Sequence, residues 1–374
     1  MIDSSSFVGV GVAITGPNDL HYAHGFGMAD VERNVPYDEH TVQTVGSVSK
    51  TLIGLAVMKV VDQGALQLDG PVNAYLPFEV VNPTHPDVPI TVRHLVTHTS
   101  TITDTEMGYL ERVYVMAEEA PVEEDISEAL APVRFNAPDS AVDMANYLQR
   151  TLARDGAWYD DTTFLRSRPG ERFTYSNIGA TLAAYVVERA TGMSFDAYTK
   201  KHILEPLGMQ DSYWQTGRWE DPALSQLFFT PTQPFPRYRL ITYADGGFAT
   251  SSADMAKYVA ELTAGHSGNG RLLSPDAYAE LFRQQLDSTH FEERGRSPYS
   301  DEYNMGVFMG YSMKGYFGHT GGDPGLASQF FVDPGTGIGR YLVVNTDVVR
   351  FREFVRIWEM MGRFSERMAG ATEQ

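Results

Sequence analysis

A serine and a lysine three residues apart form the first pair of side chains in this sequence that is suited to chemistry. The apolar residues that follow Ser47 recur with helical spacing, which predicts a helix that begins near Ser47 and ends at Gly64. Lys50 then lies one turn further on the same face, and the helix start offers free N–H groups to an oxyanion. A serine hydroxyl needs a base, and a partly desolvated lysine with a lowered pKa is one. The pair therefore predicts an activated nucleophile.

Two further groups of residues add to this pair. Tyr175 and Asn177 belong to the only Tyr-x-Asn in the sequence. A phenol held near a lysine ammonium loses its proton more easily and acts as a general base or acid, and the amide of Asn177 offers a donor and an acceptor to a substrate. The stretch 317–322 reads as a strand that ends in small residues. Such a strand lets a substrate lie along its edge, where a backbone N–H supplies an oxyanion donor.

Composition limits the classes of function that remain open. The 374 residues carry 29 basic and 48 acidic side chains, a net charge of −19, so nucleic acid and anionic membrane surfaces are not expected as partners. The absence of cysteine excludes disulfides and thiolate metal sites. No apolar run reaches transmembrane length and no signal peptide is visible, which predicts a cytoplasmic protein unless the chain has been trimmed. His94 and His98 are four residues apart, but without a His-Glu-x-x-His arrangement they favour packing over metal binding, and no metal or cofactor is predicted.

The order of predicted elements indicates how the chain is organised. Strand patterns occur at both ends and helical patterns between them, with a closing helix over 351–368. The predicted strands lie within residues 7–34, 303–311, 316–320, 327–332 and 340–345. This pattern predicts an α/β fold in which both chain ends build one antiparallel sheet flanked by helices. We expect a discontinuous sheet domain over 1–65 and 240–374, a mostly helical domain over 66–239, and a site in the cleft between them.

Residues 104–171 differ in character from the rest of the helical part. They contain 15 acidic and six basic side chains and show weak periodicity, which indicates an insertion on the molecular surface. A solvated decoration and a lid or pocket wall are equally compatible with this composition.

The three groups together resemble a known superfamily. Ser47-x-x-Lys50, Tyr175-x-Asn177 and His319-Thr320-Gly321, in this order, resemble the serine β-lactamases and penicillin-binding proteins, in the branch of class C β-lactamases, DD-peptidases and family VIII esterases. The similarity extends from about residue 7 to about residue 360 and implies a β-lactamase-like fold. The Ser-Asp-Asn element of class A enzymes is absent.

The resemblance also implies a role for each matching residue. Ser47 becomes the acylated nucleophile, Lys50 its proton partner and Tyr175 the second acid/base group. The oxyanion hole would consist of the backbone N–H groups of Ser47 and Gly322. Substrate contacts would come from Asn177, His319, Thr320 and Gly321.

One position departs from the pattern of the superfamily. His319 stands where many members have lysine, and a histidine is only partly protonated at neutral pH. It therefore provides a weaker anchor than lysine for a substrate carboxylate.

These residues predict a serine hydrolase that acts on an ester or amide of a small molecule through an acyl-enzyme on Ser47. We expect an esterase most of all. The alternatives are a D-amino-acid peptidase or amidase, a β-lactamase, and a non-catalytic penicillin-binding sensor of the same fold. The sequence contains no Gly-x-Ser-x-Gly, dinucleotide-binding or P-loop motif, and it does not predict an oligomeric state.

Overall fold

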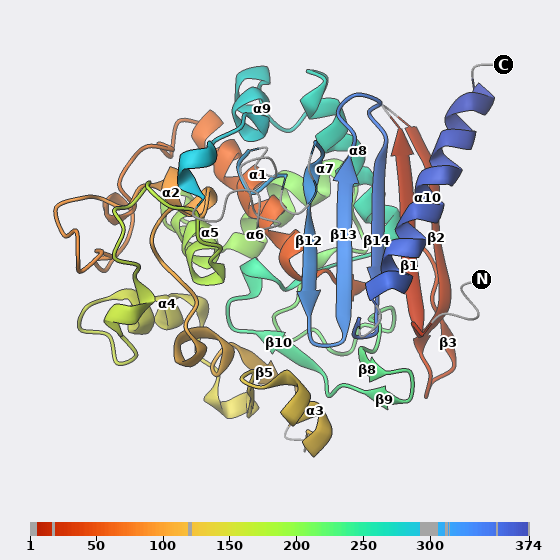
Figure 1. The fold of residues 1–374 in the computed structure, drawn as a ribbon, viewed down its shortest axis with the longest axis horizontal. Coiled ribbons are helices and arrows are strands. Elements are labelled where there is room, and N and C mark those ends of the chain that lie inside the picture. Colours follow the sequence, from red (N-terminus) through yellow and green to blue (C-terminus); the bar gives the residue numbers. More distant parts are fainter. Residues whose placement is uncertain are drawn as a thin grey trace.

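A six-stranded antiparallel sheet built from both ends of the chain dominates the structure (Figure 1). The structure, a computed structural model, describes residues 6–16, 19–118, 122–291, 306–310, 313, 315–348 and 351–372. The strand order is β12-β13-β14-β1-β2-β3, so β12 lies at one edge of the sheet. The strands are β1 (Gly9–Gly16), β2 (Asp19–Asp30), β3 (Val35–Pro36), β12 (Phe317–Asp323), β13 (Leu326–Val332) and β14 (Gly339–Val344).

Helices cover both faces of this sheet because the strands are apolar on both sides. Along β1, Val10 and Val12 face α10 (Phe351–Thr372) and pack with its Ile357. Ala13 faces the opposite way, into the main core, where α8 (Ser252–His266) packs against β1 and β14. The period of two along the strand thus divides its side chains between two apolar layers.

The middle of the chain forms a mostly helical part beside the sheet (Figure 1). Within it, α1 packs against α5, and α1 also contacts β12 of the sheet. Its helices are α1 (Ser49–Asp62), α2 (Val92–Val96), α3 (Glu124–Leu130), α4 (Met144–Leu152), α5 (Asn177–Thr191), α6 (Phe195–Thr199), α7 (Glu205–Leu207) and α9 (Pro275–Phe282). The described residues also form smaller sheets. One joins β10 (Tyr238–Leu240), β5 (Tyr114–Met116) and β6 (Phe135–Asn136), and a second joins β4 (Gln43–Thr44), β11 (Phe248–Thr250) and β7 (Tyr213–Trp214). A third pairs β8 (Phe228–Thr230) with β9 (Gln233–Pro234).

The predicted antiparallel sheet from both chain ends is confirmed. The first hairpin and the last three strands lie where the sequence places them. The strand expected over 303–311 falls partly outside the described residues, and its described part forms only a bridge between Gly306 and Met309. No helix in the described ranges is long and apolar enough to cross a membrane.

One apolar core runs through both of the predicted domains. It includes Ala13 of the sheet and Tyr185 of α5, and the segment 104–171 contributes Val113, Tyr147 and Leu148 to it. The division into 1–65 with 240–374 and 66–239 therefore remains a proposal about the architecture. The segment 104–171 is in any case partly built into the core.

Candidate active site

The predicted nucleophile lies on a sharp turn between β4 and α1. The predicted helix starts as a 3-10 turn, Gly46–Val48, and continues as α1 from Ser49, so the expected boundary is displaced by two residues. Gly46 has φ +54°, a left-handed conformation that favours glycine. Neighbouring elements fix the turn, because the N–H of Val45 donates to Phe248 O (2.9 Å) and its carbonyl accepts from Ser328 Oγ (2.6 Å).

The edge strand β12 passes directly against this turn. A Cβ added to Gly321 would lie 2.1 Å from Val45 O and 3.0 Å from the N of Ser47. A Cβ added to Gly46 would lie 2.7 Å from the N of Gly322. Only glycines allow the two backbones to approach so closely. The approach brings the N–H groups of Ser47 and Gly322 into one neighbourhood, as an oxyanion hole requires.

Lys50 is fully buried in the first turn of α1 and points at the serine. Its Nζ donates to Ser47 Oγ (3.0 Å) and to the backbone carbonyl of Asp245 (2.8 Å). The first contact is the one that the spacing predicts. The second comes from a turn almost two hundred residues away, so the spacing of residues in the sequence does not reveal it.

The expectation of a lowered lysine pKa is wrong. Burial by itself lowers the pKa of Lys50, but the facing Tyr175 and the carboxylates of Asp245 and Asp104 oppose burial and raise the pKa above its usual value of 10.5. A cation surrounded by acidic groups keeps its proton even when water is excluded. Lys50 is therefore an ammonium in the resting site.

Tyr175 completes the group. Its hydroxyl shares hydrogen bonds with Ser47 and Lys50, and Lys50 Nζ lies 5.1 Å from the centroid of its ring. Burial raises the pKa of Tyr175, while the Lys50 ammonium acts in the opposite direction without cancelling the rise. The resting pair is an ammonium beside a neutral phenol. The structure thus brings together the three residues that the sequence selected for catalysis.

Asp104 holds the loop that carries Tyr175. Its carboxylate accepts from the backbone N–H groups of Asn177 (2.8 Å) and Ile178 (3.0 Å), the first two residues of α5. A carboxylate at a helix N-terminus satisfies free N–H groups and interacts favourably with the helix dipole. Asn177 is thereby fixed as the first residue of α5, one residue after the Ser176 cap. Sequence reasoning missed Asp104, because the residues it binds lie more than seventy positions further along the chain.

His319 is neutral, which corrects the expectation of partial protonation at neutral pH. Its side chain is buried on β12, where Nδ1 hydrogen-bonds to Thr320 O, and its ring centroid lies 6.2 Å from that of Tyr175. Burial, with the nearby charge of Lys50, lowers the pKa of His319 to about 3. This position on β12 therefore carries no positive charge.

Two carboxylates border the site and were not predicted. Asp245 Oδ2 accepts from the hydroxyl of Tyr109 (3.0 Å), and Asp323 Oδ1 accepts from that of Tyr114 (3.0 Å). Burial raises the pKa of Asp245 to about 6 and, together with the charge of Asp245, that of Asp323 to about 7. Asp323 directly follows Gly322. Both tyrosines belong to the segment 104–171, so this segment contacts the residues around the site.

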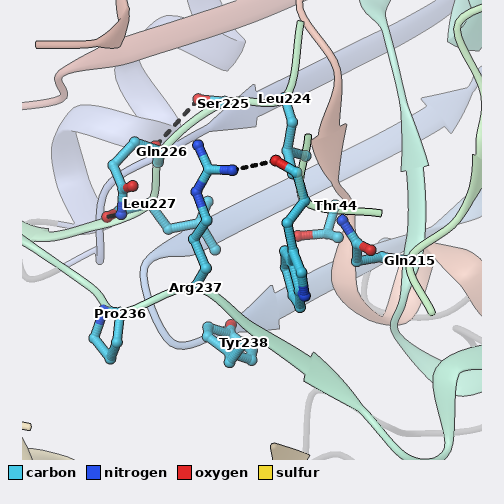
Figure 2. A pocket seen from close by; sticks show the side chains of 10 residues that line it. Thr44, Gln215, Leu224, Ser225, Gln226, Leu227, Pro236, Arg237 and Tyr238 are labelled. Carbon is cyan, nitrogen blue, oxygen red and sulfur yellow. Dashed lines mark hydrogen bonds between the residues drawn. The ribbon is translucent and has the colours of Figure 1, made fainter. Parts of the chain in front are cut away.

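A small cavity lies apart from these residues (Figure 2). It is lined by Thr44, Trp219, Arg237 and Tyr238 among others, has a volume of about 30 Å³, and contains none of the predicted site residues. Two of its lining residues are bonded to each other, because Arg237 donates from Nη1 to the carbonyl of Trp219. The volume suits water and excludes an organic substrate. Among the described residues, no group of three or more His, Cys, Asp or Glu side chains is arranged to hold a metal ion.

The fold and the site define a protein of the β-lactamase and penicillin-binding protein type. The sequence model of the Beta-lactamase family matches residues 1–359, and the chain belongs to this family, whose members are serine hydrolases. It is 27% identical over 303 residues to the putative penicillin-binding protein PbpX of Bacillus subtilis, a match that covers 79% of this chain and 64% of the relative.

Solved structures share the fold. The octameric penicillin-binding protein homologue of Pyrococcus abyssi superposes with a TM-score of 0.68 at 24% identity, over 91% of this chain and 70% of that one. EstCE1, described as a hydrolase with promiscuous acyltransferase activity, superposes with a TM-score of 0.66 at 19% identity, over 92% and 90%. The chain spans 59% and 64% of the length of the first two curated relatives it matches.

Proposed function

We propose that this protein is a serine hydrolase that cleaves small esters through an acyl-enzyme on Ser47. One observation carries the proposal: Lys50 Nζ lies 3.0 Å from Ser47 Oγ, and the hydroxyl of Tyr175 hydrogen-bonds to both. A nucleophile, a buried amine and a phenol in mutual contact can carry the proton of the serine to the leaving group. A binding protein would have no need of the complete set.

The charge state of the pair determines how the reaction begins. At rest Lys50 and Tyr175 are both protonated, so neither can accept the proton of Ser47. One of them must first lose a proton to solvent. Ser47 Oγ then attacks the ester carbonyl and passes its proton to the pair, while the N–H groups of Ser47 and Gly322 stabilise the oxyanion. Tyr175 returns the proton to the departing alkoxide as the C–O bond breaks.

The second half of the reaction repeats the proton transfers in reverse. Water attacks the acyl carbonyl and gives a proton to the pair of Lys50 and Tyr175. When the tetrahedral intermediate collapses, the pair protonates Ser47 Oγ, and the carboxylic acid leaves. The enzyme returns to its starting protonation state, and no cofactor enters the scheme.

The neutral His319 favours esters over substrates with a free carboxylate. Penicillins and peptides with a carboxyl-terminal D-residue carry such a carboxylate, and a cation on β12 would bind it. With the pKa of His319 lowered to about 3, that cation is missing. We propose that Thr320 and Gly321 contact the substrate along the strand edge and that Asn177 contacts its acyl side. A D-amino-acid peptidase or amidase is the second candidate, because Asn177 offers both a donor and an acceptor to an amide.

The test is the intact-protein mass after brief exposure to p-nitrophenyl butyrate and, separately, to a penicillin. We expect release of nitrophenol with turnover and no lasting penicillin adduct from the wild type, and loss of nitrophenol release in Ser47→Ala. A lasting penicillin adduct on Ser47 would instead indicate a peptidase or a sensor. Full activity of Ser47→Ala would refute the assignment of the nucleophile.

A further inference from the structure

His98 lies behind Tyr175 in an unusual backbone conformation. It follows α2, is 5% exposed, and has φ +56°. Left-handed backbone is uncommon for residues other than glycine and costs free energy that surrounding contacts must offset. Strained residues of this kind cluster at functional sites, so the contacts of His98 indicate what the strain supports.

Two hydrogen bonds connect His98 to the residues on either side of Tyr175. Its backbone carbonyl accepts from the N–H of Thr174 (2.7 Å), and its Nδ1 accepts from the N–H of Ser176 (3.1 Å). The centroid of its ring lies 4.4 Å from that of Tyr175. One residue therefore fixes the backbone before and after the tyrosine and also packs against its ring.

The bond from Ser176 determines the state of the imidazole. Because Nδ1 accepts, the ring proton lies on Nε2, and Nε2 is buried with no hydrogen-bond partner among the described residues. An unsatisfied buried donor destabilises the fold. Burial, with the charge of Lys50, holds the pKa of His98 well below its usual range, so the ring stays neutral and Nδ1 remains an acceptor.

We propose that His98 is a positioning residue that holds the hydroxyl of Tyr175 against Ser47 and Lys50. The inference rests on the proposed function and adds a residue to it. His98 acts through the backbone and the ring of Tyr175. A histidine that only fills the core would lack this dependence on Tyr175, and the experiment below uses that difference.

His94, which lies within α2 four residues before His98, provides a matched control. Its Nδ1 also accepts from a backbone N–H, that of Thr91 (3.2 Å), and burial also lowers its pKa. Its bond closes the start of α2 and does not involve Tyr175. His94 and His98 thus make the same kind of hydrogen bond for different purposes.

The first comparison uses His98→Leu, His98→Asn and His94→Leu, with p-nitrophenyl butyrate as substrate. We expect His98→Leu to lower kcat by about 100-fold with little change in KM, a typical effect of a misplaced acid/base group. Asparagine tolerates left-handed backbone and presents an acceptor near the place of Nδ1, so His98→Asn should recover most of the loss. His94→Leu should retain kcat within a few-fold, and thermal unfolding of each variant shows which ones fold.

The second comparison is a double-mutant cycle with Tyr175→Phe, measured as the rate at which a fluorophosphonate labels Ser47. If His98 acts through the hydroxyl of Tyr175, His98→Leu causes no further loss in the Tyr175→Phe background. An equal fold-loss in both backgrounds, or equal kcat for His98→Leu and His94→Leu, would overturn the inference.

The same labelling separates this inference from the proposed function. If Ser47 of the wild-type protein is not labelled, the proposed function fails. Crystal structures of His98→Leu and His94→Leu then decide the positioning role: a displaced Tyr175 in the first variant alone supports it, and an unmoved Tyr175 in the first variant refutes it.

Discussion

The two sides of the site are positioned in different ways. On the nucleophile side, Ser47 and Lys50 lie within one turn of the same segment, and the edge strand β12 fits against them through Gly321. On the acid/base side, Tyr175 lies in a loop that His98 and Asp104 hold from outside. The first side is built by short spacing and close backbone packing, and the second by side chains from distant segments.

This difference shows where tolerance to mutation should lie. Two backbones in direct contact leave no space for a side chain. On the nucleophile side, a single added carbon at Gly321 would therefore clash with a carbonyl oxygen. Side-chain contacts can be replaced by others of similar shape and hydrogen bonding. Substitutions on the acid/base side should therefore reduce activity by graded amounts. Three variants test the comparison.

Gly321→Ala should cause the largest loss of the three. Its Cβ would lie 2.1 Å from Val45 O, so β12 must move away from the Ser47 turn. Displacing an oxyanion donor costs about 100-fold in kcat, and forcing atoms into a packed site destabilises by about 1–3 kcal/mol. The measurements are kcat with p-nitrophenyl butyrate and the unfolding temperature.

Gly322→Ala is the control for stability at the neighbouring position. A Cβ there meets only Leu326 O, at 3.9 Å, so its unfolding temperature should stay close to that of the wild type. If Gly321→Ala unfolds at the wild-type temperature with full activity, the close approach of the two backbones is not needed for the reaction.

The difference between contacts set by local spacing and contacts made by distant side chains also explains what could be predicted from the sequence. Period-two and helical patterns located the terminal strands and α1, because these patterns follow directly from which side chains face the core. The Ser47–Lys50 contact was predictable because a helical turn fixes it. Tyr175 and the strand 317–322 were recognised as separate groups, and their resemblance to a superfamily placed them in one site.

The parts that were missed depend on the folded surroundings. Asp104 has no local signal, because its partners at the start of α5 are distant in sequence. The charge states of Lys50 and His319 were predicted wrongly, since burial and neighbouring charges decide them and neither can be read from spacing. The sequence favours a packing role for His98 and does not indicate its two bonds around Tyr175.

Asp245→Asn should produce an intermediate effect, on the pH dependence of the reaction. We expect kcat/KM of the wild type to rise with pH as the pair of Lys50 and Tyr175 loses a proton. The Asp245 carboxylate raises the pKa of Lys50, so removing its negative charge lowers that pKa and moves the rise to lower pH. The backbone carbonyl that accepts from Lys50 is unchanged.

Tyr109→Phe controls for disturbance of the same carboxylate. It removes the hydroxyl that donates to Asp245 Oδ2 and keeps the negative charge, so the pH profile should move much less than in Asp245→Asn. The measurement is kcat/KM against pH with spontaneous hydrolysis subtracted. A profile that is identical in Asp245→Asn and the wild type would show that this carboxylate does not control the pair.

Asp323→Asn should have the smallest effect on activity and a stabilising effect on the fold. The pKa of Asp323 is raised from 3.8 to about 7 in the folded protein. Between about pH 4 and pH 7 Asp323 is therefore ionised in the unfolded chain and still protonated in the folded protein. This group therefore makes the wild type less stable as pH rises from about 4 to about 7. An asparagine still accepts from Tyr114 and carries no charge to bury.

The unfolding temperature of the variant should exceed that of the wild type by at least about 2 °C at pH 8. This difference should grow between about pH 4 and pH 7 and stay constant above pH 7. A difference independent of pH would mean that Asp323 is ionised in the folded protein throughout, and that the nucleophile side tolerates a buried charge beside its backbone contact.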